Sequence, residues 1–145
     1  FRYTALLAIG YQHAFINHQY ISAEELGDQT LIHYPVERKR LDIFTQFLDP
    51  SGVEPSNTRQ ADLTLMIVQL VASGRGVACL PNWALQPYLD AGLITSKPLG
   101  KTGIWPTLYA AIREDQKESS YMRDFLQQSL QSCNQNLVGI EPVKS

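Results

Sequence analysis

The 145-residue chain contains few of the residues that mark metal and redox proteins. Its two cysteines, Cys79 and Cys133, form no CxxC pair, and its three histidines, His13, His18 and His33, lack the spacing of metal ligands. We therefore expect no metal site. Cys79, between alanine and leucine, is expected to pack as a small buried hydrophobe, and Cys133 to be a free thiol.

Long apolar runs and a strong charge of one sign are also missing. No apolar run approaches the about 18 residues of a membrane-spanning helix, and the first residues show no signal-peptide pattern. The formal net charge is only -2, and no basic face could follow a phosphate backbone. We expect a cytoplasmic protein without direct DNA or membrane contacts, whose partner is a small molecule or another copy of itself.

The sequence contains none of the common catalytic motifs. There is no GxSxG, no Walker loop, no HExxH, and no recognisable Cys/His or paired-carboxylate arrangement. We therefore expect neither an enzyme nor a cofactor.

The most informative segment is Asp62–Pro81, which reads as a helix, a glycine turn and a strand. Asp62 or Thr64 can cap the helix, because either side chain can accept a hydrogen bond from a first-turn N–H. The helix is apolar on nearly every side, so it should lie beneath other elements. Gly74 should end it in the left-handed conformation, and residues 77–80 resemble a covered parallel strand.

Apolar periodicity and breaking residues predict the remaining elements. Helices are expected over 37–49, from Asn82, from Pro87, and from Ser119 or Ser120, with Ser22 and Glu25 forming a capping box at another helix start. Strands are expected at Tyr3–Ile9, Thr30–Tyr34, near residue 58, at Leu93–Thr95 and at Ile104–Ile112. The alternation between residues 28 and 97 predicts a doubly wound α/β lobe.

Four sequence blocks resemble the effector-binding domain of LysR-type transcriptional regulators. In chain order they are TLIHYPVERKRLDIF (30–44), FLDPSGVEP (47–55), VASGRGVACLP with the following Asn82 and Trp83, and GIWPTLYAAIRE (103–114). The similarity runs from about Phe1 to Gln131, and is most specific to family members that regulate methionine biosynthesis and respond to homocysteine. It implies an α/β, periplasmic-binding-protein-like type II effector domain, with one complete doubly wound lobe and an incomplete second lobe.

The resemblance also implies a division of the chain. Residues 28–97 would form the second effector lobe, residues 1–27 and 98–131 a remnant of the first, and residues 132–145 a frayed C-terminal tail. Tyr3–Ile9 and Ile104–Ile112 would be antiparallel crossover strands of the first lobe. Its other strands, and the N-terminal helix-turn-helix domain that would contact DNA, are not in this sequence.

Candidate binding residues follow from the rule that open α/β sheets bind ligands at the carboxyl ends of strands, near helix N-termini. At the first such corner, Arg38 either binds a carboxylate beside a wall formed by Tyr34 or belongs to a solvated face. At the second, Asp62, Leu63 and Thr64 either hold the carboxylate or amine of a ligand or simply cap the helix.

The third corner contains Asn82, which can donate a hydrogen bond at the end of a strand, and Trp83, which is either a core residue or a ligand wall. Across the cleft, Gly10, Tyr11 and His13 follow the first strand and are weaker candidates. The resemblance raises the ligand interpretation of the second corner, since the matching residues line the effector cleft in LysR-type domains.

The sequence thus predicts the ligand-sensing portion of a LysR-type transcriptional regulator of methionine biosynthesis. Its effector would be homocysteine or a related small amino acid, and the protein would act as a homo-oligomer. The alternative is a fragment of a periplasmic-type solute-binding receptor, which shares the two-lobed architecture but would need a signal peptide and two complete lobes.

Overall fold

A computed structural model describes residues 1–143 of the chain. Its centre is a three-stranded sheet in which β2 (Ala5–Ile9) lies between β5 (Ala78–Pro81) and β6 (Thr95–Pro98), antiparallel to both. Leu7 stands opposite Cys79 on one side and Lys97 on the other. The expected α/β class is confirmed, but β5 pairs mainly in the antiparallel sense instead of the parallel sense expected.

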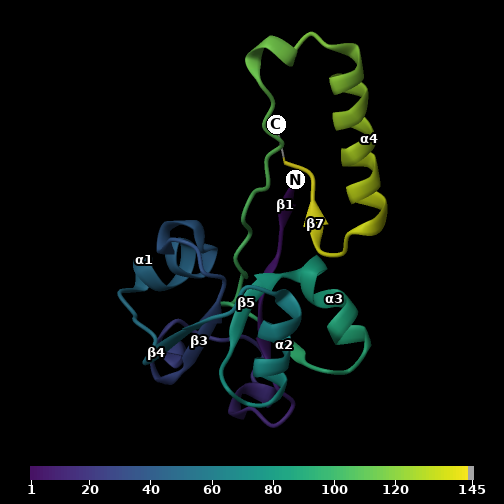
Figure 1. The fold of residues 1–145 in the computed structure, drawn as a ribbon. Helices are drawn as coiled ribbons and strands as arrows, with labels where there is room; N and C mark the ends of the chain where they lie inside the picture. The colour runs from purple at the N-terminus through teal and green to yellow at the C-terminus, as the bar shows by residue number, and fades with distance from the viewer. Residues whose placement is uncertain (144–145) are drawn as a thin grey trace.

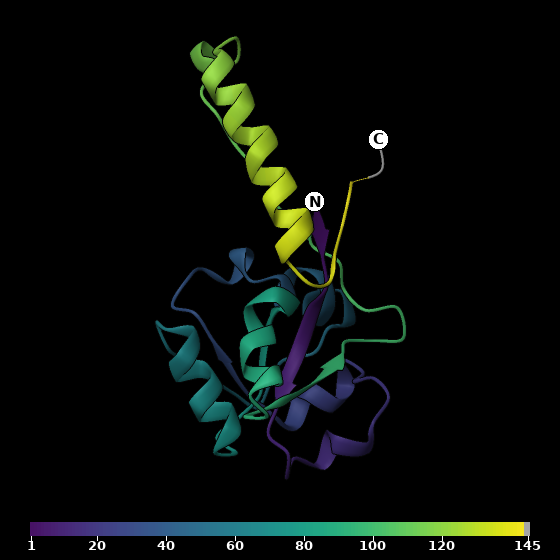
Figure 2. The same ribbon diagram turned by 90° about the vertical axis from the view of Figure 1, so that its right-hand side faces the viewer.

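Strand β2 is buried on both faces, and alternate side chains enter different hydrophobic clusters. Ala5, Leu7 and Ile9 pack with the short helices on one side of the sheet. Ala8, with Leu6 partly buried beside it, packs against α2 (Thr64–Ala72) and α3 (Asn82–Asp90) on the other. The sheet is therefore covered by helices on both faces (Figure 2).

A second strand pair extends this layer. β3 (Thr30–His33) runs parallel to β4 (Asn57–Gln60), and a parallel bridge between Leu31 and Val77 connects β3 to the start of β5. The expected strands at Thr30–Tyr34 and near residue 58 are thus confirmed. Parallel pairing of β3 with the β5 segment brings the carboxyl ends of both strands to the same edge.

The expected helix over 37–49 is divided. Leu41 has an extended backbone (φ -103°, ψ 108°) and separates a 3-10 turn, η3 (Arg38–Arg40), from a π-helix, η4 (Ile43–Leu48), which continues into α1 (Asp49–Ser51). Three successive cations oppose the dipole at a helix start, which disfavours one continuous helix. Ile43, Phe44 and Leu48 are nevertheless buried, so the divided segment still packs apolar side chains into the core.

Helix α2 is less enclosed than its composition suggested. Ile67, Val68 and Val71 are fully buried, but Leu65 and Met66 are more than half exposed. Neither predicted cap is used, because Leu63 occupies the N-cap position and no side chain there accepts a hydrogen bond. Gly74, at φ +73°, closes the helix as expected.

Two further boundaries were predicted wrongly. Pro87 begins no new helix but lies inside α3, where burial of Leu85 holds the helix together across the lost backbone hydrogen bond. The strand expected at Leu93–Thr95 begins only at Thr95, because the N–H of Leu93 bonds to the carbonyl of Tyr88 and closes α3.

The two expected crossover strands are also changed. Ile104–Ile112 forms only isolated antiparallel bridges, from Ile104 to Ala5 and from Thr107 to Arg2, since Pro106 has no N–H for a ladder. The other strand splits at Thr4 into β1 (Arg2–Tyr3) and β2. Moreover, β2 lies in the same sheet as β5 and β6, although we expected it in the other lobe; the lobe boundaries themselves remain a prediction.

The C-terminal part is more ordered than expected. Helix α4 (Ser120–Asn136) begins as predicted, with Ser119 at the N-cap position, but continues past residue 132. β7 (Ile140–Glu141) then pairs antiparallel with β1, so the expected frayed tail is wrong up to residue 141; residues 144–145 lie outside the described residues. Helix α4 and the chain before it project away from the main body (Figures 1 and 2).

The remaining elements are short 3-10 turns: η1 (Ala14–Asn17), η2 (Glu24–Asp28) and η5 (Glu114–Gln116). The predicted capping box is half formed, since the Glu25 carboxylate accepts a hydrogen bond from the N–H of Ser22 at 2.8 Å. Within residues 1–143, no helix has the length and apolar character needed to cross a bilayer.

We predict that Gly76 cannot accept a side chain without a shift of the neighbouring backbone. A Cβ there would lie 2.5 Å from the carbonyl oxygen of Thr30, and φ is +156°. Gly74→Ala is the matched control, because its Cβ would meet nothing within 4 Å and only the left-handed strain of about 1–2 kcal/mol applies. Gly76→Ala should lower the free energy of unfolding in urea by about 1–3 kcal/mol more than the control; equal losses would contradict this packing.

Candidate functional site

A cavity of about 180 Å³ opens where the carboxyl ends of β3 and β5 meet the amino end of β2. Ala5 stands opposite Pro81 at this edge, and Tyr34 directly follows β3. The cavity is therefore a product of strand direction, since β3 and β5 end where β2 begins. This is the kind of edge at which open α/β sheets bind ligands.

The aliphatic part of the lining comes from the sheet and from the segment before η4. Ile32 and Leu80 extend from β3 and β5, and Leu41 and Ile43 come from the opposite side. Polar groups share the same space, from Tyr3, His33, Tyr34, Arg40, Asp42 and Cys79. Apolar walls with a few convergent polar groups are typical of small-molecule sites.

Tyr34 connects this cavity to the start of α2. Its hydroxyl lies 2.6 Å from the hydroxyl of Thr64, the first residue of that helix. The structure thus brings together two residues that the sequence placed at different corners. Because each hydroxyl can donate one hydrogen bond and accept others, the pair can present a donor to a ligand oxygen.

Asp42 is fixed from two sides. Its Oδ2 accepts a hydrogen bond from the Tyr3 hydroxyl at 2.9 Å, and its Oδ1 accepts one from the Gln46 side-chain amide at 2.8 Å. Burial, followed by the hydrogen bond to Asp42, raises the pKa of Tyr3 well above its usual range. Burial also raises the pKa of Cys79, with a smaller contribution from Asp42. The phenol and the thiol beside this carboxylate are therefore both neutral near pH 7.

Arg38 is directed elsewhere. Its Nη1 donates to Glu54 at 2.9 Å and its Nε to Asp49 at 3.1 Å, while the guanidinium lies 4.0 Å from the centre of the Phe44 ring. It borders a separate hollow between η3 and β4. Because two carboxylates of the same chain already bind the guanidinium, the geometry supports the solvated-face interpretation over the carboxylate-binding one.

Gly10, Tyr11 and His13 lie at the opposite end of β2. They border a different hollow of about 590 Å³ beside the end of α2. His13 Nε2 lies 2.9 Å from the Gln29 side-chain oxygen, and its Nδ1 accepts a hydrogen bond from the N–H of Phe15. These residues therefore do not face Tyr34 across one cleft, because antiparallel pairing places the end of β2 far from the end of β5.

The other predicted residues do not line the cavity. Asp62 and Leu63 are exposed before α2. Asn82 begins α3, where a Cβ on Gly139 would collide with its side-chain amide. Trp83 lies edge-on to Tyr3, with ring centres 6.4 Å apart, and its indole nitrogen is buried without a hydrogen-bond partner within residues 1–143.

Sequence reasoning missed Tyr3, Arg40 and Asp42 as site residues and assigned Cys79 to the core. No local spacing marks them, since Tyr3 and Asp42 are 39 positions apart in the chain. The one available signal was the position of Arg40 and Asp42 next to the first predicted corner. In the part of the chain that the structure describes, no three His, Cys, Asp or Glu side chains gather as metal ligands.

Comparisons with known proteins identify the fold and the family of the chain. The regulatory domain of MetR, a LysR family regulator from Neisseria meningitidis, superposes with a TM-score of 0.93 at 33% identity, over 99% of this chain and 66% of that one. The HTH-type transcriptional regulator MetR of Escherichia coli K12 is 37% identical over 126 residues, 87% of this chain and 39% of that protein. MetR of Haemophilus influenzae is 41% identical over 105 residues, 72% of this chain and 34% of that protein.

The chain thus spans about two fifths of the length of the curated relatives it matches. These relatives are transcriptional regulators and not enzymes, and the match to the Neisseria domain confirms the effector-domain fold expected from the sequence. The profile of the LysR substrate binding domain matches residues 1–134. The chain belongs to the LysR substrate-binding-domain family.

Proposed function

We propose that this chain is the effector-sensing part of a transcription regulator of methionine biosynthesis, and that its effector is homocysteine or a related small sulfur amino acid. The observation that carries the proposal is the cavity at the carboxyl ends of β3 and β5, with the hydroxyls of Tyr34 and Thr64 at the start of α2. The similarity to MetR proteins supports the choice of pathway.

The size and chemistry of the cavity favour a small polar ligand. Its volume of about 180 Å³ is below the about 300–1,000 Å³ of pockets for drug-sized molecules. The lining combines aliphatic side chains with hydroxyls and charges, which suits a short apolar side chain on a polar head. The first-turn N–H groups of α2 and its dipole add a preference for an anionic group near Thr64.

The proposed role is binding without chemistry. A bound effector changes the protein only through its different affinity for two arrangements of the subunits, so the regulator would act as a homo-oligomer. DNA would be contacted through a helix-turn-helix domain outside these residues, in keeping with the HTH-type name of the relatives. The regulator would work in the cytoplasm.

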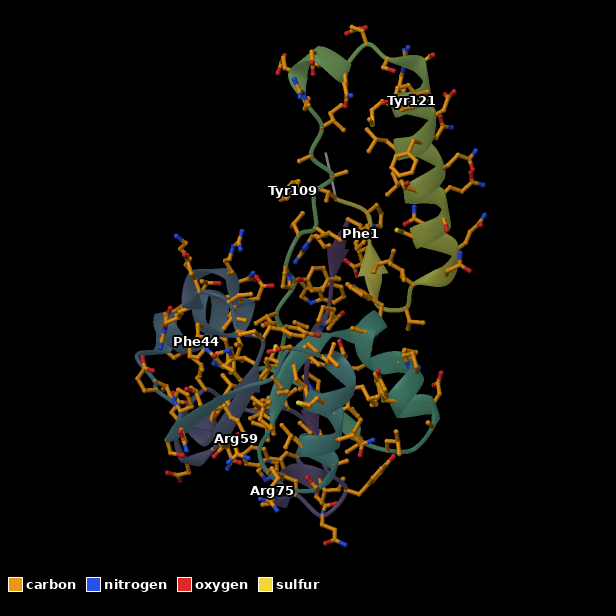
Figure 3. All side chains as sticks on the ribbon, in the orientation of Figure 1. Phe1, Phe44, Arg59, Arg75, Tyr109 and Tyr121 are labelled. Carbon is orange, nitrogen blue, oxygen red and sulfur yellow. The ribbon has the colours of Figure 1, made fainter. Side chains whose placement is uncertain are left out.

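We predict that L-homocysteine binds the chain and that Tyr34→Phe weakens this binding. Loss of one neutral hydrogen bond costs about 0.5–1.5 kcal/mol, so Kd should rise about 2- to 12-fold. Isothermal titration calorimetry measures both values. Tyr121→Phe is the matched control, because Tyr121 is 63% exposed on α4, in the projecting part of the molecule (Figure 3), and should leave Kd unchanged.

Two outcomes would count against the proposed function. Absence of any heat of binding at millimolar homocysteine would reject this effector. An equal effect of Tyr34→Phe and Tyr121→Phe would show that the ligand does not meet the Tyr34 hydroxyl.

A further inference from the structure

We propose that Arg40 and Asp42 make the cavity selective for zwitterionic α-amino acids, with Asp42 binding the ammonium group and Arg40 the carboxylate. This inference rests on the proposed function, and adds to it the two residues that would recognise the ligand head group. It follows from the arrangement of charges around one small cavity.

Arg40 and Asp42 line the same cavity from one short segment, with Leu41 between them. Neither side chain forms an ion pair with the other or with any other residue within 1–143, although the neighbouring Arg38 and Lys39 both do. A cavity that presents one cation and one anion, each without a counter-ion, is complementary to a ligand that carries both charges. A ligand with a single charge would leave one of the two residues unmatched.

Asp42 is held in place for such a role. The Tyr3 hydroxyl and the Gln46 amide each occupy one of its oxygens, and a carboxylate has about four acceptor positions, so further donors can still be accepted. Tyr3 and Cys79, which line the same cavity, have raised pKa values and stay neutral near pH 7. Among residues 1–143, Asp42 is the one carboxylate that lines the cavity, so it is the anionic side chain that an ammonium group would meet there.

The carboxylate of the ligand has a matching position. The Arg40 guanidinium can form a charge-assisted hydrogen bond with it, and Tyr34 lines the same cavity. His33 also lines the cavity, and its Nδ1–H donates to the carbonyl of Tyr34 at 2.7 Å. The remaining walls, formed by Ile32, Leu80 and the Cys79 thiol, are suited to a short apolar or sulfur-containing side chain.

The test compares three ligands by calorimetry on the 145-residue chain. They are L-homocysteine, mercaptobutyrate, which is homocysteine without its amino group, and mercaptopropylamine, which is homocysteine without its carboxylate. Asp42→Asn should raise the Kd of homocysteine by about 10- to 140-fold, the usual range for a hydrogen bond to a charged group, and leave mercaptobutyrate unchanged. Arg40→Gln should weaken homocysteine and mercaptobutyrate similarly and leave mercaptopropylamine unchanged.

Each control variant has the same net charge as the test variant with which it is compared. Asp124→Asn and Arg123→Gln make the same changes on α4, away from the cavity, and should alter no Kd. Thermal unfolding shows whether each variant folds. If Asp42→Asn does not, the unchanged chain still tests the inference, because it should bind homocysteine at least 10-fold more tightly than mercaptobutyrate by the same charge-assisted contribution of about 1.5 kcal/mol.

The results separate this inference from the proposed function. Homocysteine binding that is insensitive to both variants, or equal binding of homocysteine and mercaptobutyrate, overturns the zwitterion site and leaves the function standing. If homocysteine does not bind, but another α-amino acid binds with an affinity that depends on Asp42 and Arg40, the proposed effector is overturned and the zwitterion site is supported. Binding of no α-amino acid overturns both.

Discussion

The structure depends on the double pairing of β2. This five-residue strand is antiparallel to β5 and β6, and its alternate side chains enter the two hydrophobic clusters. Fully burying one such side chain contributes about 1.5–3 kcal/mol, and β2 contributes Leu7 and Ile9 to one cluster without any exposed surface. Because its neighbours come from residues 78–98, the strand joins distant parts of the chain in one core.

The same pairing determines where ligands can meet the sheet. The amino end of β2 lies beside the carboxyl ends of β5 and β3, and there the cavity brings Tyr34, Asp42 and the Cys79 thiol together. The opposite end of β2 leads to Gly10, where an added Cβ would lie only 3.0 Å from the Val71 carbonyl oxygen. The hollow beside it is lined by no Asp, Glu, Lys or Arg of residues 1–143. The two ends of β2 therefore border two different hollows, of which the one at its amino end is lined by charged side chains.

The cavity is also adjacent to the connection between the main body and the projecting part. Tyr3 holds Asp42 and packs on Trp83, yet belongs to β1, which pairs with β7 directly after α4. In Figure 3, Tyr109 and Tyr121 lie on the two sides of this projecting part, far from Arg59 and Arg75 on the body. A ligand that contacts Asp42 therefore lies one hydrogen bond from the strand that carries the projecting part.

Local sequence patterns correctly predicted the elements whose formation depends on neighbouring residues in the chain. Short apolar runs located β3 and β5, and Gly74 marked the end of α2, since these signals require no distant partner. The strand expected at Ile104–Ile112 failed because β-structure needs a neighbour, and within residues 1–143 the segment has no strand partner beyond the hydrogen bonds between Leu108 and Phe1. The central position of β2 depends on pairing across about 70 residues, which no periodicity encodes.

In the candidate site, too, residues were predictable only where their position depends on the local sequence. Tyr34 and Thr64 were predictable, because each follows or starts an element at a strand end. Arg38 lies outside this cavity, and its two carboxylate partners lie 11 and 16 positions further along the chain, where no local pattern marks them. No local pattern marks Asp42, whose position at the cavity depends on Tyr3, 39 positions away.

The position of the ligand tests the central claim most directly, namely that the site lies where β3 and β5 end. Amide chemical shifts of the isotope-labelled chain, recorded by NMR during titration with L-homocysteine, would locate it. The account predicts the largest shift changes at His33, Tyr34, Asp42 and Leu80, which line the cavity, and small changes at Gly10 and His13. The largest changes at Gly10 and His13, with none at Tyr34 or Asp42, would contradict it.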